Sequence, residues 1–394
     1  MNGALHGVRI LDLSNVVSGP LAVQMLADQG ADVIKVEQPG TGDIARLAGA
    51  QSGGVSSMFA VLNRNKRSIV LDMRVSEAKS IMIDLIETAD VLVQNFRPGA
   101  MKRIGLDYDT LKGRFPKLIY VSISGFGADG PYAARRVYDP IIQAVTGFIA
   151  TQKISGSKKP ELIKNIVCDK ATALTTAQAI TAALFARERG QGGQHVEIAM
   201  MDAGLAFLWP DGMWNDTFTS DDVPKTPPLS DIYRVTKTKD GYVTYLVVSD
   251  AEWQGMCKAL GYESLGTAEK FKSLPDRLAN IDELIAFLEA EIGKWDTTDI
   301  CNELEKYEVP FARINELDEV ASDPQIAHRR SIRKVDHPHG GPMQMPEPPA
   351  RFEKTPSTFR HHAPMLGQHS KEILTEIGKE PDDIARLSDM GALG

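Results

Sequence analysis

The sequence predicts an α/β protein with a doubly wound parallel sheet in a large domain and a smaller α+β domain further along the chain. Short apolar runs alternate with amphipathic segments over the first 200 residues, which is typical of parallel strands covered on both faces by helices. A hairpin signal at Asp240-Gly241 and three helical patterns follow. With 394 residues, the chain also exceeds the size at which one hydrophobic core stops growing.

The strands of the sheet are expected at the apolar runs 7–13, 31–37, 67–71, 90–94, 117–123 and 195–199. Helices are expected over residues 21–29, 76–88 and 170–188, with Ser18-Gly19-Pro20 as a turn before the first of them. Ligands of such sheets bind beyond the carboxyl ends of the strands. The loops at that edge are therefore the candidates for a functional site.

The second part of the chain begins after a Pro-rich connection over residues 215–231. We expect strands at 232–236 and 242–248 and helices at 252–260, 281–292 and 298–306. From about residue 329 the chain is rich in Pro, His and Gly, and it shows helical periodicity only over 368–377. These patterns predict a large domain over 1–208, a small domain with linkers over 209–330, and a C-terminal segment, 331–394, that returns to the large domain.

Composition excludes several classes of protein. The formal charge of −8 argues against a nucleic-acid-binding role, which requires a basic surface. The chain has no apolar run of roughly 18 residues and no secretory signal at its start, so a soluble, cytoplasmic protein is expected. Cys168, Cys257 and Cys301 are widely spaced, which fits a reducing compartment rather than a disulfide framework.

The common nucleotide and hydrolase motifs GxGxxG, GxxxxGK[ST], HExxH and GxSxG do not occur. Four histidines, His337, His339, His361 and His362, lie close in sequence but have no acidic or cysteine partners at metal-ligand spacing. We interpret them as loop residues. No metal and no tightly bound cofactor are expected.

A series of blocks spans nearly the whole chain in order and resembles the class III CoA-transferases of the CaiB/BaiF family. The blocks are Leu11-Asp12-Leu13, Ser18-Gly19-Pro20, 25–37, Gly42-Asp43 with Arg46, 62–68, 89–99, 122–127 with Gly130-Pro131-Tyr132, Asp169, Gly192-Gly193-Gln194 and 363–369. The resemblance implies the CaiB/BaiF fold, with a Rossmann-like large domain and a small domain. It also implies an interlocked homodimer, in which each chain threads through its partner.

Asp169 carries the chemistry that the resemblance implies. Taken alone, an Asp between an apolar run and a long helix is most simply an N-cap. The resemblance instead assigns it as the nucleophile that attacks an acyl-CoA, holds anhydride and aspartyl-CoA thioester intermediates, and passes CoA to a carboxylic acid. The two roles are compatible, because a helix start also favours a negative charge.

The resemblance further implies a set of contacts with the nucleotide, the pantetheine or the reacting carbonyl of CoA. The matching positions are Val16, Val17, Gln38, Leu71, Asn95, Phe96, Arg103, Arg136 and Tyr138. The two arginines can pair with phosphates through bidentate hydrogen bonds, although either can also be a solvated surface charge. Phe96 can equally be a core residue.

Two positions depart from the branches of the family and leave alternatives open. Position 17 is Val where the formyl-CoA transferase branch has Gln, and residues 212–240 lack that branch's glycine-rich loop. Position 138 is Tyr where the racemase branch places a His base. The alternatives are therefore an α-methylacyl-CoA racemase or related acyl-CoA isomerase, and a CoA-binding protein without catalytic activity. The acids that exchange CoA are not indicated.

Overall fold

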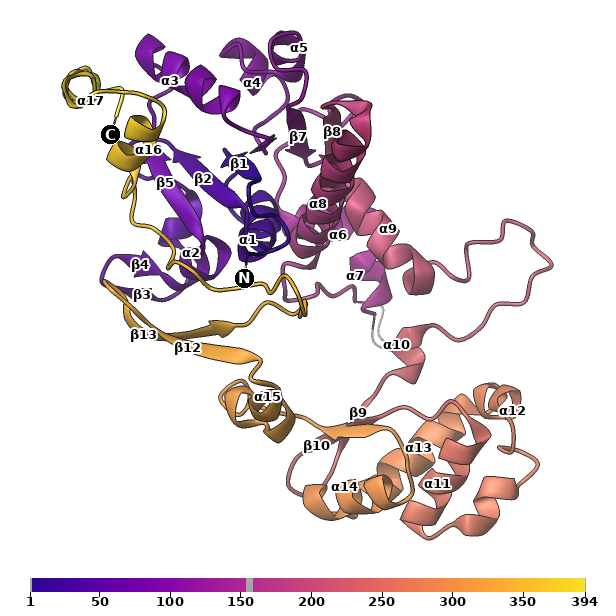
Figure 1. Cartoon of the computed structure of the whole chain (residues 1–394). Helices are drawn as coiled ribbons and strands as arrows, with labels where there is room; N and C mark the ends of the chain where they lie inside the picture. The colour runs from indigo at the N-terminus through magenta and orange to yellow at the C-terminus, as the bar shows by residue number, and fades with distance from the viewer. Residues whose placement is uncertain (1, 154–158, 394) are drawn as a thin grey trace. The chain divides into compact units, whose positions relative to one another are not determined.

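The computed structural model describes residues 2–153 and 159–393 of the chain. Its main sheet has six parallel strands in the order β5-β2-β1-β6-β7-β8 (Figure 1). The strands are β1 (Arg9–Asp12), β2 (Asp32–Glu37), β5 (Lys66–Val70), β6 (Val91–Gln94), β7 (Ile119–Ser124) and β8 (His195–Ala199). This sheet confirms the predicted parallel α/β architecture.

Side chains of the central strands alternate between two helical layers, because successive residues of a strand point to opposite faces. Leu11, Ile34 and Ile69 are fully buried in one apolar cluster. Their neighbours Asp12 and Lys35 are also fully buried, but they point to the opposite face. Asp12 and Lys35, the fully buried charged residues of β1 and β2, therefore lie on one face of the sheet.

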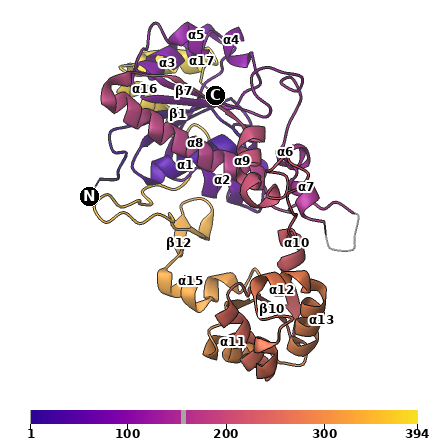
Figure 2. The same ribbon diagram turned by 90° about the vertical axis from the view of Figure 1, so that its right-hand side faces the viewer.

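The polar face is covered by α1 (Ser18–Asp28) and α8 (Val167–Ala186), which pack side by side (Figure 2). The apolar face is covered by helices that share one core cluster with the sheet. They are α3 (Ser76–Glu87), α4 (Ala100–Arg103), α5 (Tyr108–Leu111), α16 (Ser370–Glu376) and α17 (Pro381–Asp389). The C-terminal helices thus complete the core that the first strands begin.

Both helices on the polar face begin earlier than predicted. Residues 18–20 form the first turn of α1 rather than a turn before it. Pro20 is tolerated there because the amide protons of a first turn have no partner within the helix. The prediction for α8 began at residue 170, whereas the helix begins at Val167 and includes Asp169 in its first turn.

The structure contains local elements that the sequence did not predict. A small hairpin of β3 (Gln51–Ser52) and β4 (Val55–Ser56) leads into α2 (Ser57–Leu62). In the tail, β12 (Ile332–His337) and β13 (Gly341–Pro346) pair as a second hairpin, so the expectation of an irregular tail before residue 368 was wrong.

Contacts within the chain divide it into two compact units. The first contains the main sheet and comprises the described residues up to Thr146, Ile163–Phe207 and the chain from His328 onward. The second comprises Leu208–Ala327 and the described part of Gly147–Leu162.

The second unit has an antiparallel sheet in the order β11-β10-β9 and a core around the fully buried Trp253. The predicted strand 232–236 is displaced to β9, because α10 follows directly after Pro228. The elements are α7 (Phe148–Thr151), α10 (Leu229–Ile232), β9 (Val235–Lys237), β10 (Tyr242–Tyr245), α11 (Asp250–Leu260), α12 (Leu274–Ala279), α13 (Ile281–Ile292), α14 (Thr297–Lys306), β11 (Phe311–Arg313) and α15 (Pro324–Arg329), with α9 (Met200–Gly212) leading into the unit. Within the described residues, every helix is too short or too polar to span a bilayer.

Candidate active site

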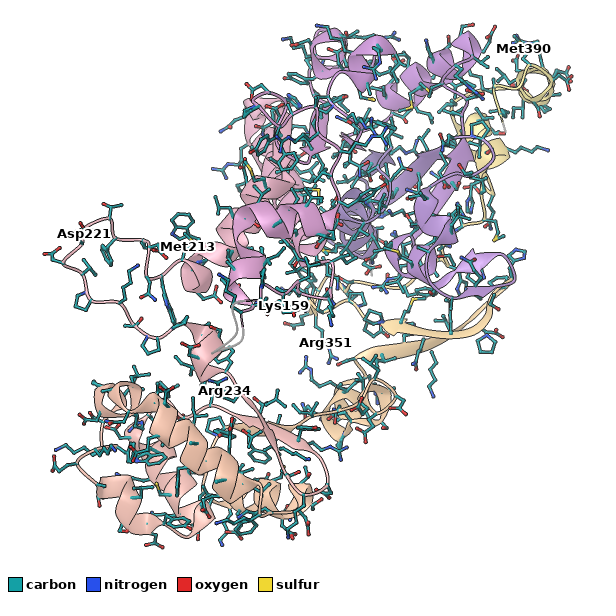
Figure 3. All side chains as sticks on the ribbon, turned by 180° about the vertical axis from the view of Figure 1, so that it is seen from behind. Lys159, Met213, Asp221, Arg234, Arg351 and Met390 are labelled. Atoms are coloured by element: carbon teal, nitrogen blue, oxygen red, sulfur yellow. The ribbon has the colours of Figure 1, made fainter. Side chains whose placement is uncertain are left out.

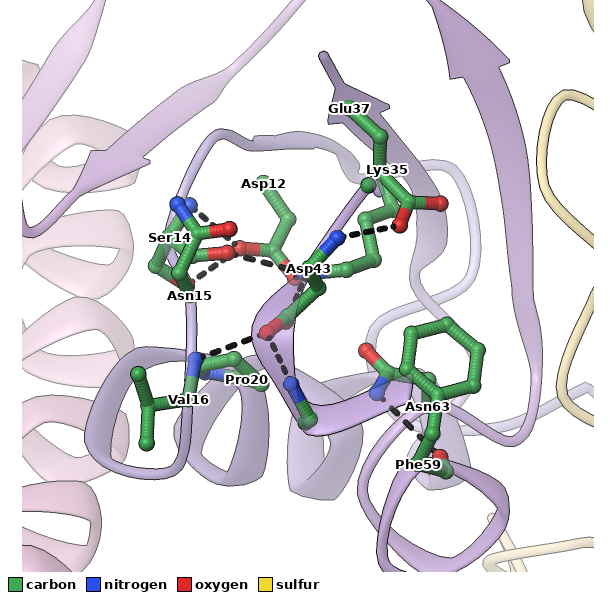
Figure 4. Close-up of polar contacts among 12 residues, drawn as sticks. Asp12, Ser14, Asn15, Val16, Pro20, Lys35, Glu37, Asp43, Phe59 and Asn63 are labelled. Atoms are coloured by element: carbon green, nitrogen blue, oxygen red, sulfur yellow. Dashed lines mark hydrogen bonds and ion pairs between the residues drawn. The ribbon is translucent and has the colours of Figure 1, made fainter. Parts of the chain in front are cut away.

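Four charged side chains meet beneath the β1–α1 turn with no exposure to solvent, and Figure 4 shows three of them, Asp12, Lys35 and Asp43. Asp12 ends β1, Lys35 lies in β2, Lys66 begins β5, and Asp43 precedes the short 3-10 helix η1 (Ile44–Leu47). Lys66 Nζ lies 2.8 Å from an oxygen of Asp12, and Lys35 Nζ lies 2.9 Å from an oxygen of Asp43. Two charges of each sign neutralise one another, as buried charges require.

The pKa values reflect this pairing. Burial by itself would raise the pKa of Asp12, but the positive charges of Lys35 and Lys66 lower it to about 2. Burial lowers the pKa of Lys66 to about 8, because the charge of Asp12 offsets the loss of water only in part. For Lys35, the effect of burial is outweighed by Asp12 and Asp43, and its pKa is raised. Asp12 and Lys35 are therefore ionised at neutral pH.

The charged group holds the turn between β1 and α1 in an unusual conformation. Lys35 Nζ donates to the carbonyl oxygen of Ser14 at 2.9 Å, and Asp43 Oδ1 accepts from the N–H of Val16 at 3.0 Å. Val16 has a φ of 71°, in the left-handed region that β-branched residues avoid. Such a residue costs about 1–3 kcal/mol and persists only where its surroundings impose it.

Asn95 holds the same turn from the end of β6. Its Oδ1 accepts from the N–H of Asn15 at 2.9 Å, and its Nδ2 donates to the carbonyl oxygen of Asn15 at 2.8 Å. The Asn95 side chain is thus occupied in the turn. Of the predicted CoA contacts, Val16, Val17 and Asn95 are brought together here, and Val17 is almost fully buried.

Asp169 is the third residue of α8, so the simple N-cap interpretation is wrong. The N-cap is Ile166, which makes no side-chain hydrogen bond. The free amide of Asp169 is instead bound by Asp139, whose Oδ2 accepts it at 2.9 Å from the start of α6 (Asp139–Thr146). The other oxygen of Asp139 accepts from Gln143 Nε2 at 2.6 Å. A residue from a neighbouring helix therefore caps the start of α8.

The carboxylate of Asp169 faces the first turn of a second helix. The hydroxyl and the main-chain N–H of Ser18, the first residue of α1, lie close enough to lower the pKa of this carboxylate. The carboxylate thus lies near the amino ends of α1 and α8, where the free N–H groups and the helix dipoles favour negative charge. Two helices provide donors for a negative charge that develops at this point.

The pKa of Asp169 is nevertheless raised from its ordinary value of 3.8 to about 6. Burial is the largest cause, because Asp169 is only 9% exposed, and the charge of Asp139 is the second. The hydrogen bonds from Ser18 act in the opposite direction. At neutral pH the group is an ionised, poorly hydrated carboxylate, which is a stronger nucleophile than a solvated one.

A cavity of about 550 Å³ lies at the carboxyl ends of β1, β2, β5 and β6. It brings together four of the predicted CoA contacts, namely Gln38, Leu71, Phe96 and Arg103. Leu13 and Met101 add apolar surface, and Arg74 adds a second guanidinium. The cavity therefore combines apolar walls with two cationic groups.

The last two predicted contacts, Arg136 and Tyr138, do not line this cavity. They lie in the loop before α6, and Tyr138 is 67% exposed. Tyr138 directly precedes Asp139, so the loop leads to the residue that binds the amide of Asp169. The structure thus does not bring these two residues together with the other predicted CoA contacts that line the cavity.

Three residues of the site were missed from the sequence. Ser18 was noted within a turn motif, but its contact with Asp169 depends on α1 beginning there. Asp139 lies 30 residues before Asp169 and carries no sequence signal for its role. Arg74 follows β5 and is paired with Asp72 at 2.6 Å, and its position after a strand of the sheet was the available signal.

The tail histidines take part in loop contacts. His337 Nδ1 accepts from the amides of His339 and Gly340, each at 3.1 Å, and its Nε2 lies 3.2 Å from the carbonyl oxygen of Ala363. Over residues 2–153 and 159–393, no three His, Cys, Asp or Glu side chains are grouped in a way that could hold a metal ion.

Comparison with known proteins identifies relatives over the whole chain. The model of CoA-transferase family III matches residues 5–370. An acyl-CoA transferase from Fusarium pseudograminearum is 36% identical, and the alignment covers 99% of this chain and 88% of that protein. A succinate–glutarate CoA-transferase from Agrobacterium fabrum is 34% identical over 95% of each chain.

Solved structures agree with these relatives. The crystal structure of a CaiB/BaiF family protein from Brucella suis matches with a TM-score of 0.80 at 33% identity, over 96% of this chain and 100% of that one. A hypothetical protein from Mycobacterium tuberculosis matches with a TM-score of 0.82 at 29% identity, over 94% of this chain and 99% of that one. Both similarities extend over nearly the whole fold.

The raised pKa of Asp169 predicts a cost in stability that a neutral residue would remove. Because the folded pKa of about 6 exceeds the unfolded 3.8, the folded state is penalised above pH 6, and the penalty disappears as pH falls below 4. Asp169→Asn is expected to raise the free energy of unfolding at pH 8 by roughly 3 kcal/mol at most, and by about half as much at pH 5. Urea unfolding of both proteins at each pH measures the difference.

Asp221→Asn provides the matched control. Asp221 lies on the exposed connection after α9 (Figure 3), and its replacement is expected to leave the free energy of unfolding unchanged at both pH values. A stability of Asp169→Asn equal to or below that of the unmodified protein at pH 8 would show that the site does not destabilise the Asp169 carboxylate.

Proposed function

This chain belongs to CoA-transferase family III, and from that premise we propose that it moves coenzyme A from an acyl-CoA to a carboxylic acid through covalent intermediates on Asp169. The observation that carries the proposal is the placement of Asp169. Its carboxylate is buried, has Ser18 as a neighbour that lowers its pKa, and lies at the amino ends of two helices. Few structural carboxylates combine these features, because burial without a cationic partner is unfavourable.

In the first half of the reaction, an oxygen of Asp169 attacks the carbonyl carbon of the donor thioester. The C–S bond breaks, CoA leaves as a thiolate, and the donor acyl group and Asp169 form a mixed anhydride. The thiolate then attacks Cγ of Asp169 and displaces the donor acid as a carboxylate. An aspartyl-CoA thioester remains, and no net proton is consumed or released.

In the second half, the acceptor carboxylate attacks Cγ of Asp169 and displaces the CoA thiolate. A second mixed anhydride forms between Asp169 and the acceptor. The thiolate attacks the acceptor's carbonyl carbon, the C–O bond to Asp169 breaks, and the new acyl-CoA leaves. Asp169 returns to a free carboxylate, so the cycle balances with one thioester broken and one formed.

The surroundings of Asp169 suit this sequence of steps. Negative charge moves between the attacking oxygen, the carbonyl oxygens and the thiolate, and the amino ends of α1 and α8 stabilise it at each stage. The low exposure of Asp169 restricts water, which would otherwise hydrolyse the anhydride or the thioester. No step requires a proton donor, which fits a site with Tyr138 rather than a His base beside Asp139.

We assign the cavity of about 550 Å³ to coenzyme A. Arg103 and Arg74 would pair with its phosphates, and Phe96 and Leu71 would contact the adenine or the pantetheine. Val16, Val17 and Asn95 would guide the pantetheine toward Asp169 along the β1–α1 turn, and Arg136 and Tyr138 would face the acyl group. Short dicarboxylic acids are the first acids to test, because the Agrobacterium relative is named for succinate and glutarate.

We also propose that the protein is a homodimer, interlocked as in the family it belongs to. Four large apolar side chains on the neighbouring helices α6 and α8 are between 46% and 65% exposed, which favours burial against a second copy. They are Ile141, Val145, Leu174 and Phe185. Light scattering is expected to give twice the mass of one 43.1 kDa chain, and a single-chain mass at micromolar concentrations would contradict the dimer.

We also propose a cytoplasmic location and a division of the chain into a large and a small domain. Cys168, Cys257 and Cys301 are free thiols in the structure, which fits a reducing compartment. The large domain, proposed over 1–208, would bind CoA and carry Asp169, and the small domain with its linkers is proposed over 209–330. The C-terminal segment 331–394 would complete the large domain.

Asp169→Ala is expected to lower the rate of transfer from succinyl-CoA to glutarate on the order of 10⁴-fold, because both anhydrides and the thioester form on this residue. Asp221→Ala, on the exposed connection, is expected to transfer at the normal rate. Normal transfer by Asp169→Ala would contradict the proposal. Exchange of the α-proton without an acceptor acid would favour the racemase, and CoA binding without either reaction would favour a binding protein.

Arg103→Gln is expected to raise KM for the acyl-CoA about 10-fold to 100-fold with kcat little changed, since a charge-assisted hydrogen bond to phosphate contributes roughly 1.5–3 kcal/mol. The matched control is Arg97→Gln, because Arg97 is exposed in the loop just before α4, which ends at Arg103, but does not line the cavity. Equal KM values for the two variants would place the CoA phosphates elsewhere.

A further inference from the structure

We propose that Asp43, Lys35 and Asn95 are positioning residues that hold the β1–α1 turn in its strained form, so that Ser18 meets Asp169 in the geometry needed for reaction. The inference rests on the proposed role of Asp169 as the nucleophile. The inference adds a set of side chains that position the nucleophile without contacting it.

The first observation is that all three residues before Val17 are bound through their main chain by side chains from elsewhere. The carbonyl oxygen of Ser14 accepts from Lys35, and the amide of Val16 donates to Asp43. Both main-chain groups of Asn15 are bound by Asn95. These bonds come from β2, from the residue that precedes η1 and from the residue that follows β6, so three separate segments hold the turn.

The second observation is that the turn needs this restraint. Val16 has a φ of 71°, and a valine released from its partners would return to a negative φ. Asp43 and Lys35 are fully buried and lie 2.9 Å apart, so neither can move independently of the other. Asp43 and Lys35 therefore hold the β1–α1 turn rigidly.

The third observation connects the turn to the nucleophile. Val17 is the N-cap of α1 and has no side-chain capping bond of its own, and Ser18 is the first residue of the helix. Only Val17 separates the restrained Val16 from Ser18, which lies beside Asp169 where α1 packs on α8. A change at Val16 therefore redirects the hydroxyl and the amide of Ser18, whereas Asp139 continues to face Asp169 from α6.

The test compares Asp43→Asn with the double variant Asp43→Asn/Val16→Gly. Asp43→Asn removes the charge that pairs with Lys35, and kcat for transfer is expected to fall about 10-fold to 100-fold with KM for the acyl-CoA within about threefold. Glycine adopts a positive φ without strain, so the double variant is expected to recover most of the lost kcat. A purely structural role for Asp43 predicts no recovery, because glycine adds flexibility to the turn.

Glu308→Gly is the matched control for the second substitution. Glu308 also has a positive φ, at 56°, but it is exposed in the second unit. Added to Asp43→Asn, it is expected to restore nothing. If Asp43→Asn fails to fold, Asn95→Ala removes the restraint on Asn15 without leaving a buried charge unpaired, and it is expected to show the same loss and the same recovery with Val16→Gly.

A second readout does not depend on transfer activity. Carbodiimide labelling of the peptide that contains Asp169, measured by mass spectrometry against pH, reports the ionisation of this carboxyl. Loss of the Ser18 donors is expected to raise the labelling midpoint by about half a pH unit or more in Asp43→Asn, and Val16→Gly is expected to return it toward that of the unmodified protein.

The outcomes separate the two proposals. An unmodified protein that does not transfer CoA would contradict the proposed function, while the labelling midpoints would still test the restraint. An unchanged kcat and midpoint in Asp43→Asn, a loss confined to KM, or no recovery in the double variant would overturn the positioning role.

Discussion

The β1–α1 turn depends on four charges that have no contact with water. Asp12, Lys35, Asp43 and Lys66 are each fully buried, and they occupy the face of the sheet on which α1 rests. Removing one of them would leave an unpaired charge in the interior, which typically costs 3–5 kcal/mol. The same four residues therefore stabilise the sheet and fix the main chain that leads into α1.

The β1–α1 turn leads to Asp169, whose carboxylate is itself buried. Asp169 forms no ion pair with a described residue, its neighbour Asp139 carries the same charge, and burial raises its pKa. Ser18 and the amino ends of two helices partly compensate for this cost. A poorly hydrated carboxylate is a good nucleophile, so under the proposed function the stability lost at this position would be exchanged for reactivity. The surrounding network supplies the rigidity that such a site requires.

The sequence predicted the parts of the fold that follow from local pattern. Apolar runs located the parallel strands, because buried strands have no polar face. It did not predict the start of α1, since Ser18-Gly19-Pro20 is typical of a turn, nor the contact of Asp139 with the amide of Asp169, which depends on how α6 packs against α8. The β12–β13 hairpin was missed because Pro and Gly within it conceal the strand pattern. Similarity to a family located Asp169, but only the structure revealed the donors around it.

The central claim is that Asp169 carries the covalent intermediate. The most direct measurement is to incubate the protein with an acyl-CoA, trap activated carboxyl groups with hydroxylamine, and determine by mass spectrometry which peptide becomes a hydroxamate. We expect modification of the peptide that contains Asp169, only in the presence of acyl-CoA. Active transfer with an unmodified Asp169, or with the hydroxamate on another residue, would contradict it.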